Sequence, residues 1–168
     1  MMEAVTAREP AGSAQDLIKV WFRFVPRENW LPYDEEGMWA IPLGDDVVQI
    51  DNIPFLVPGV AQEDRVRITT DADGLHRAVE RVEWSGNFTI RVLPEHDGPI
   101  GPSVQAVREQ FTPFGVTAEG FSADLPLTAL NIPADADLSA VKALLQQGQE
   151  AGWWWYEEAC IGDAWREA

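Results

Sequence analysis

The spacing of apolar residues changes near residue 98, and this change limits the folds open to the chain. Before it, apolar and polar residues alternate, which is typical of strands with one buried face. After it, two stretches repeat their apolar residues at the helical spacing of three to four. The breaker cluster GPIGP at 98–102 separates the two patterns. The sequence therefore predicts an α+β protein with a β-rich first half.

The second half contains six segments in the order strand, helix, strand, strand, helix, strand. The N-cap residues Ser103 and Asp137 begin the two helices. The predicted strands are 88–92, 116–121, 125–132 and 153–157. This order is that of a ferredoxin-like split β-α-β-β-α-β subdomain, in which two helices cover one face of an antiparallel four-stranded sheet.

The first half predicts short strands joined by turns, in a small β-barrel or a curled antiparallel sheet. The strands are 17–25, a hairpin over 38–51 around a Gly-Asp turn, 65–70 and 75–84. The predicted organisation is a disordered leader over 1–15, a β-rich subdomain over 16–87, a ferredoxin-like subdomain over 88–160 and a C-terminal tail over 161–168.

The chain is strongly acidic, with 28 acidic against 12 basic residues and a net charge of −16. Residues 95–168 contain 12 acidic and 3 basic residues, a net of −9. Such a field repels nucleic-acid phosphates, so we expect no nucleic-acid partner. A solvated acidic surface accounts for the charge, and so does docking on a basic protein or peptide.

Cysteine and histidine are too few for the common zinc sites. The single cysteine, Cys160, excludes an internal disulfide and a multi-cysteine zinc site, and the two histidines stand at unrelated positions. We therefore expect no metal and no cofactor. The sequence contains no apolar run of membrane-spanning length and no signal-peptide pattern, which predicts no membrane association and a cytoplasmic location. It does not determine the oligomeric state.

Four motifs follow one another in the order found in a known family. They are EGMWA at 36–40, DNIPF at 51–55, DRV at 64–66 and SGNFTIRV at 85–92. This succession resembles the bacterial family called domain of unknown function 4265, over roughly residues 17–160. The closing segment WWWYEE at 153–158 also resembles the last strand of ferredoxin-like regulators of the ribonuclease E inhibitor B type. Neither resemblance implies an established activity.

A polar notch is predicted where the two subdomains join. Asp51, Asn52, Ser85 and Thr89 place short hydrogen-bonding side chains beside chain reversals, and Trp39 offers an apolar wall. The structural alternative is that these groups satisfy backbone atoms at a tight turn.

Two further features are candidates for binding. Arg91 lies between apolar residues of a predicted strand, so it needs a carboxylate such as Glu36 or Asp51, either as a buried bridge or as an anchor for an anionic ligand. In the tryptophan-rich strand, Trp154 and Tyr156 point to one face, and they serve either the core or a partner.

Catalytic signatures are weak. Ser85, His76 and His96 lack a G-x-S-x-G elbow, and Cys160 follows two glutamates that raise a thiol pKa. The sequence therefore favours a non-enzymatic binding or regulatory module that engages a protein or peptide through an acidic, tryptophan-bearing surface. Two alternatives stay open: a tailoring or hydrolytic enzyme with a pocket at the subdomain junction, and an immunity-type inhibitor that mimics nucleic-acid charge.

Overall fold

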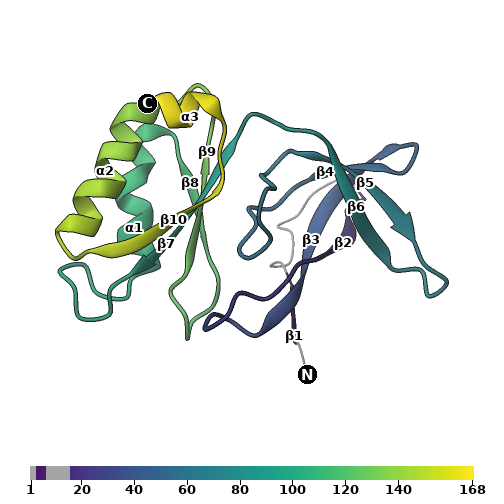
Figure 1. Cartoon of the computed structure of the whole chain (residues 1–168), viewed down its shortest axis with the longest axis horizontal. Helices are drawn as coiled ribbons and strands as arrows, with labels where there is room; N and C mark the ends of the chain where they lie inside the picture. Colours follow the sequence, from purple (N-terminus) through teal and green to yellow (C-terminus); the bar gives the residue numbers. More distant parts are fainter. Residues whose placement is uncertain (1–2, 7–15) are drawn as a thin grey trace. The chain divides into compact units, whose positions relative to one another are not determined.

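The computed structural model describes residues 3–6 and 16–168. The chain divides into two compact units, the first up to Ser85 and the second from Gly86 onward. This division lies two residues before the boundary predicted from the sequence. Together the units make a mixed α+β protein (Figure 1).

The first unit is a closed, barrel-like sheet of five strands with a sixth strand added. Its strands are β1 (Glu3–Thr6), β2 (Ile18–Arg23), β3 (Tyr33–Gly44), β4 (Val47–Ile50), β5 (Arg65–Thr70) and β6 (His76–Glu83). Strands β2 to β6 form the order β3-β2-β6-β5-β4, and pairing of β3 with β4 closes the ring. The predicted small barrel is therefore confirmed. Its closure requires a parallel pairing of β2 with β6.

Alternation along the strands builds the barrel core. In β2, Val20 and Phe22 are buried, while Arg23 is exposed. The turn between β3 and β4 uses Asp45 and Asp46 at φ of 54° and 59°, the left-handed conformations of a tight hairpin. Together the inward residues make one apolar cluster of Val20, Phe22, Met38, Ala40, Val48, Ile50, Val57, Val60, Val66 and Ile68.

Within the predicted leader, Glu3–Thr6 form strand β1, which pairs in parallel with β3. The prediction of a disordered leader over 1–15 was therefore wrong for these four residues, because β3 extends beyond its pairing with β4 and offers a free edge there. The remainder of that segment lies outside the described residues.

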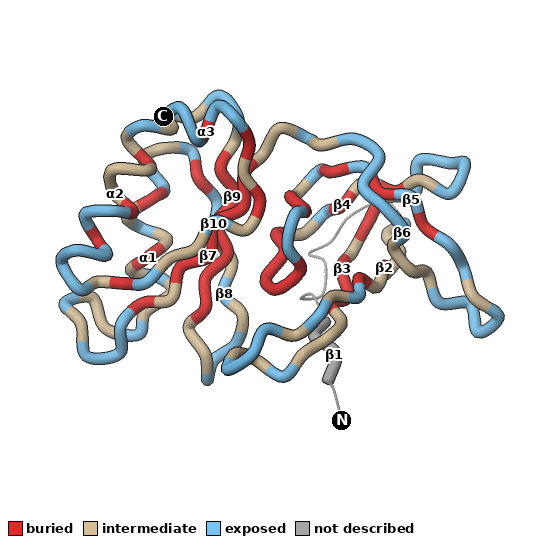
Figure 2. The backbone as a smooth tube through the Cα atoms, in the orientation of Figure 1, coloured by how far each residue is buried: buried red, intermediate tan, exposed pale blue. Residues whose placement is uncertain are grey.

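The second unit is a four-stranded antiparallel sheet with helices on one face. Its elements are β7 (Phe88–Pro94), α1 (Val104–Phe111), the 3-10 turn η1 (Thr112–Phe114), β8 (Thr117–Gly120), β9 (Thr128–Ile132), α2 (Leu138–Glu150), β10 (Trp154–Cys160) and α3 (Asp163–Glu167). The strand order is β10-β7-β9-β8. Buried residues run along the middle strands β7 and β9 (Figure 2).

Both predicted helix caps are confirmed. The Ser103 hydroxyl accepts the Ala106 N–H at 3.0 Å, and the Asp137 carboxylate accepts the Ala140 N–H at 3.1 Å. The predicted strand at 125–132 begins only at Thr128. Pro126 accounts for the delay, because proline cannot donate to a strand ladder.

The predicted tail at 161–168 is instead part of the fold. Residues Asp163–Glu167 form α3, and the Trp165 ring is fully buried against Phe88, with ring centroids 5.9 Å apart. The Trp165 indole N–H donates to Glu158 at 2.7 Å. A single large aromatic side chain thus anchors a short terminal helix that composition alone does not predict.

Candidate functional site

Asn52 and Ser85, two residues of the predicted notch, form hydrogen bonds from their side chains to backbone atoms of the first unit. The Asn52 side-chain oxygen accepts the Trp39 N–H at 2.6 Å, and the Ser85 hydroxyl donates to the Gln62 carbonyl at 2.8 Å. The Gln62 amide in turn donates to the Asp51 carbonyl at 3.0 Å. Gln62 thus connects the Ser85 segment to the Asp51 segment. Thr89 belongs to the second unit, on β7 opposite Asn131.

A small cavity of about 190 Å³ lies at one end of the barrel, where β4 and β6 end and β5 begins. Its lining residues are Gln49, Glu63, Arg65, Glu83, Trp84 and Ser85. Of the residues predicted for the notch, Ser85 lines this cavity, while Trp39, Asp51 and Asn52 are not among the lining residues. We call it the barrel-end cavity.

Charges crowd the barrel-end cavity. Arg65 lies 3.3 Å from Glu83, and both side chains are more than half exposed. Burial raises the pKa of the nearby Asp51 carboxyl above its ordinary value, and the negative charge of Glu63 raises it further. Glu63 itself has φ of 72°, a left-handed conformation that is costly for this residue type.

Two buried carboxylates each accept two or more backbone N–H groups, a role that the sequence did not predict. Glu36 was expected only as a partner for Arg91. Glu36 is 1% exposed and accepts three consecutive backbone N–H groups, from Phe55 at 2.7 Å and from Leu56 and Val57 at 2.9 Å. A single carboxylate therefore fixes the proline-containing bend. The E-G-M-W motif was the available signal, because Glu36 directly precedes the apolar part of β3.

Asp64 is the second buried carboxylate, and it contacts Ser85, which lines the barrel-end cavity. It accepts the Ala61 N–H at 2.9 Å and the Ser85 N–H at 2.7 Å, and Arg81 lies 3.4 Å away. Asp64 therefore ties the end of the β4–β5 connection to the segment after β6. This contact positions Ser85 at the cavity.

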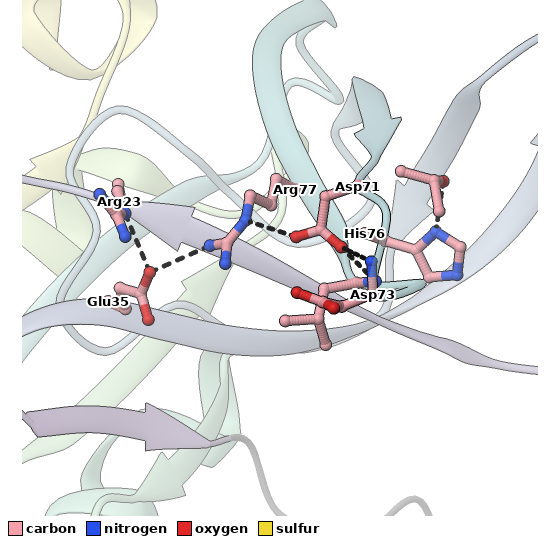
Figure 3. Close-up of polar contacts among 8 residues, drawn as sticks. Arg23, Glu35, Asp71, Asp73, His76 and Arg77 are labelled. Atoms are coloured by element: carbon pink, nitrogen blue, oxygen red, sulfur yellow. Dashed lines mark hydrogen bonds and ion pairs between the residues drawn. The ribbon is translucent and has the colours of Figure 1, made fainter.

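An arginine–carboxylate network crosses the outer surface of the barrel (Figure 3). Glu35 on β3 accepts from Arg23 at 3.0 Å and from Arg77 at 3.1 Å, and Arg77 also donates to Asp71 at 3.2 Å. The backbone N–H of Leu75 makes the largest contribution to lowering the pKa of the Asp71 carboxyl, and the backbone N–H of Asp73 lowers it further. The network thus holds the β5–β6 turn in place, and its exposed pairs are worth little individually.

Arg91 is buried on β7 and faces Glu157, which lies directly opposite on β10. The Arg91 guanidinium donates to the Glu157 carboxylate at 2.8 Å, with 4% and 16% of the two side chains exposed. Within its unit, Arg91 therefore forms a bridge between two neighbouring strands. The partner there is Glu157, which the sequence analysis did not name.

Strand β10 separates the tryptophans by face. Trp154 is 1% exposed, packs on Phe111 with centroids 5.5 Å apart, and donates its indole N–H to the Leu145 carbonyl at 3.0 Å. It therefore packs in the core of the second unit. Trp155 points to the opposite face and is 36% exposed.

Tyr156 lies on the helix-side face and is half buried. Its backbone N–H donates to the Gln149 side chain at 3.2 Å. Burial raises the pKa of the Tyr156 hydroxyl, and the charge of Glu158 raises it further. Tyr156 therefore stays neutral at physiological pH.

Each histidine has a neighbour in its own unit. His76 shares a hydrogen bond with Thr70 at 2.9 Å. His96 lies in the second unit beside Asp97, where both side chains are highly exposed. The described residues contain no group of three or more histidine, cysteine or acidic side chains suited to a metal ion. They also contain no helix long and apolar enough to span a membrane.

Comparisons with known proteins agree with this architecture. Residues 36–156 match the family described as "Domain of unknown function (DUF4265)", so the chain belongs to that family. A solved structure, described as a "Novel crystal structure of a hypothetical protein from Neisseria gonorrhoeae", is similar with a TM-score of 0.71. The match covers 90% of this chain and 99% of that chain at 22% identity, which shows the fold alone. No curated protein matches.

Proposed function

We propose that this chain is a non-enzymatic binding module that takes up an extended, basic peptide segment along the outer edge of β10. The position of β10 carries the proposal, because it is an edge strand of seven residues with β7 as its neighbour in the sheet. An exposed edge is a template for adding a strand.

The backbone directions of β10 support this reading. The Trp153 carbonyl accepts the Glu95 N–H at 2.9 Å, so the backbone N–H and C=O groups of Trp153 point toward the β7 side. Alternation in an antiparallel pair then directs the N–H and C=O groups of Tyr156 and Glu158 outward. The Gln149 side chain occupies the outward Tyr156 N–H. This side-chain contact protects the edge, and an incoming strand has to displace it.

The side chains of β10 favour a basic occupant. The Glu158 side chain lies on the helix-side face, and one of its oxygens accepts the Trp165 indole N–H. Trp155 lies on the other face, where its ring can stack on the stem or charged end of a lysine or arginine. The unit from Gly86 onward contains 12 acidic and 4 basic residues, a net of −8. This field favours encounter with cations.

The same proposal includes a ferredoxin-like assignment for the second unit, supported by its element order and by the strand order β10-β7-β9-β8. A cytoplasmic location fits the free, buried Cys160, and a bacterial origin is what the family resemblance implies. The resemblance to regulators of the ribonuclease E inhibitor B type stays a prediction, as does the alternative of an inhibitor that mimics nucleic-acid charge.

Fluorescence anisotropy with labelled seven-residue peptides tests the proposal. The peptide KVKVKVK is expected to bind at low salt, and EVEVEVE is expected to bind at least about tenfold more weakly because of charge repulsion. The analogue KVKPPVK is the sharper control. Its two adjacent prolines remove an N–H donor whichever alternate set of residues faces β10. Equal binding of KVKPPVK and KVKVKVK would show non-directional charge attraction and overturn the proposal.

Variants locate the site. Trp155→Ala and Glu158→Gln are each expected to weaken KVKVKVK binding by about two- to tenfold. Glu158→Gln preserves an acceptor for the Trp165 indole, so the fold is retained. Glu109→Gln is the matched control, because it removes one exposed negative charge of the same unit that belongs to α1 and not to β10. An equal effect of Glu109→Gln and Glu158→Gln would place binding elsewhere.

A further inference from the structure

Strand β6 of the first unit exposes apolar side chains that take no part in the proposed β10 site. Three of the six large apolar side chains that are exposed among the described residues lie on β6 or directly before it: Leu75 at 42%, Val79 at 57% and Val82 at 40%. The residues from Val79 to Glu83 are all exposed, as Figure 2 shows in pale blue. We call Leu75, Val79 and Val82 the β6 strip. Exposed apolar side chains gathered on one strand are a feature of interaction surfaces.

The pairing of β6 explains why the strip is open. Within the described ranges, β6 pairs with β2 only through His76 and Arg77. On the β5 side the register shifts twice and passes over Val79 and Val82. Register shifts of this kind twist a strand and disfavour the addition of another strand at its edge. A partner at β6 is therefore expected to contact side chains and not to extend the backbone ladder.

The charge around the β6 strip is balanced, unlike that of the chain as a whole. Residues 65–83, which span β5, the turn and β6, contain four arginines and four carboxylates, a net of zero, in a chain with a net charge of −16. Two exposed ion pairs, Arg65–Glu83 and Arg67–Glu80, place both signs side by side on these strands. This hairpin therefore offers no excess charge to a strongly acidic or a strongly basic partner.

We infer that the β6 strip is the contact surface of a homodimer, and that its occupant is a second copy of this chain. A two-fold interface brings the same patch together twice, so the patch has to suit itself. Apolar side chains flanked by equal numbers of positive and negative groups meet this condition. Approach through the acidic remainder of the chain is opposed by repulsion between two like net charges.

Sedimentation velocity of the whole chain tests the inference, at protein concentrations from about 10 μM to about 1 mM. A weak dimer is expected, because a strip of three side chains buries less area than a stable interface needs. A chain that is monomeric at every concentration and salt would overturn the inference and leave the strip to a different protein.

The salt dependence distinguishes this dimer from the β10 site. Dimerisation is expected to strengthen as sodium chloride is raised from about 0.05 M to about 0.5 M, since salt screens the repulsion between two acidic chains. Binding of a basic peptide at β10 is expected to weaken over the same range, because salt screens an attraction there. The two proposals therefore fail independently. A dimer that weakens as salt is added would be held together by charge and would contradict the apolar contact.

Variants locate the contact. The double variant Val79→Ser with Val82→Ser is expected to weaken dimerisation by at least about tenfold, because the contact loses two apolar side chains. Both side chains are exposed in the single chain, so the melting temperature of the dilute protein should stay close to that of the wild type. An unchanged dimer in the double variant would place the contact elsewhere and overturn the inference.

Leu43→Ser is the matched control. Leu43 has a similar exposed fraction of 45%, but it belongs to β3, which does not pair with β6. Dimerisation is expected to be unchanged in Leu43→Ser. Equal weakening by Leu43→Ser and by the double variant would show that any exposed apolar side chain promotes association, and the β6 strip would lose its assignment.

Discussion

The two units of this chain stabilise their irregular segments by different means. In the barrel, the long connection between β4 and β5 contains Pro54 and Pro58 and cannot join a strand ladder. Its backbone donors are instead accepted by the buried carboxylates of Glu36 and Asp64. In the second unit, aromatic rings fill the space between sheet and helices.

This difference follows from the hydrogen-bonding needs of each architecture. Helices and strands satisfy their own backbone groups, so the space between them can be filled by rings such as those of Trp154 and Trp165. A long connection folded against a barrel brings unsatisfied N–H groups into a buried environment. An ionised carboxylate accepts several of them at once. Buried carboxylates therefore hold the long connection of the barrel, and aromatic rings fill the core of the second unit.

The largest expected effect tests the aromatic core. Trp154→Ala is expected to lower the free energy of unfolding by about 3–5 kcal/mol, because it leaves a large cavity beneath α2. The control Trp155→Ala, on the opposite face of the same strand and 36% exposed, is expected to have a much smaller effect. Urea denaturation measures both. Similar losses for the two variants would contradict the assignment of Trp154 to the core.

Gly148 offers a check on the same contact. A Cβ at Gly148 would overlap the Trp154 ring, so Gly148→Ala should destabilise the protein by about 1–3 kcal/mol despite the better helix propensity of alanine. An increase in stability would mean that helix α2 does not lie close to this ring.

The next effect concerns the buried bridge. Arg91→Ala is expected to cost about 3 kcal/mol, because it leaves the Glu157 carboxylate without its closest cation and removes packing volume. Arg91→Met should be better tolerated, since methionine retains the volume of the aliphatic stem. Thermal unfolding compares the two variants. Melting temperatures equal to that of the wild type in both would assign Arg91 a role in binding.

A smaller effect is expected in the barrel. Glu36→Ala should cost about 2 kcal/mol, because three N–H groups lose their acceptor, although water can enter the vacated space. Hydrogen exchange at the Phe55, Leu56 and Val57 amides should accelerate far more than exchange at amides of β5, which do not bond to Glu36. Unchanged exchange at these three amides would show that the carboxylate does not hold the bend.

The smallest effect is a pH dependence at the surface. In the folded protein the pKa of Asp71 is lowered below its ordinary value of 3.8. The contribution of Asp71 to the stability of the fold is therefore fully present above pH 3.8 and is lost as the pH falls through the folded pKa. In Asp71→Asn this acid-side loss should be absent. The control is Asp73→Asn, in the same turn. Identical acid profiles of melting temperature for Asp71→Asn and wild type would refute the assignment.

Local structure followed closely from the sequence. Alternation predicted the strand over 17–25, which the structure has at Ile18–Arg23, and Ser103 and Asp137 were recognised as helix caps. These features depend on neighbours within a few residues, so periodicity and side-chain chemistry are sufficient to find them. The order of elements from β7 to β10 followed in the same way.

The tertiary structure alone decided where the functional candidates lie. Alternation placed Trp154 and Trp155 on opposite faces of a strand, but only the position of α2 made Trp154 a core residue. Likewise Glu36 meets its three donors about twenty residues later in the chain, and Ser85 reaches a cavity through Asp64. The physical reason is that burial and hydrogen-bond partners depend on which distant segments pack together, and local periodicity carries no information about that pairing.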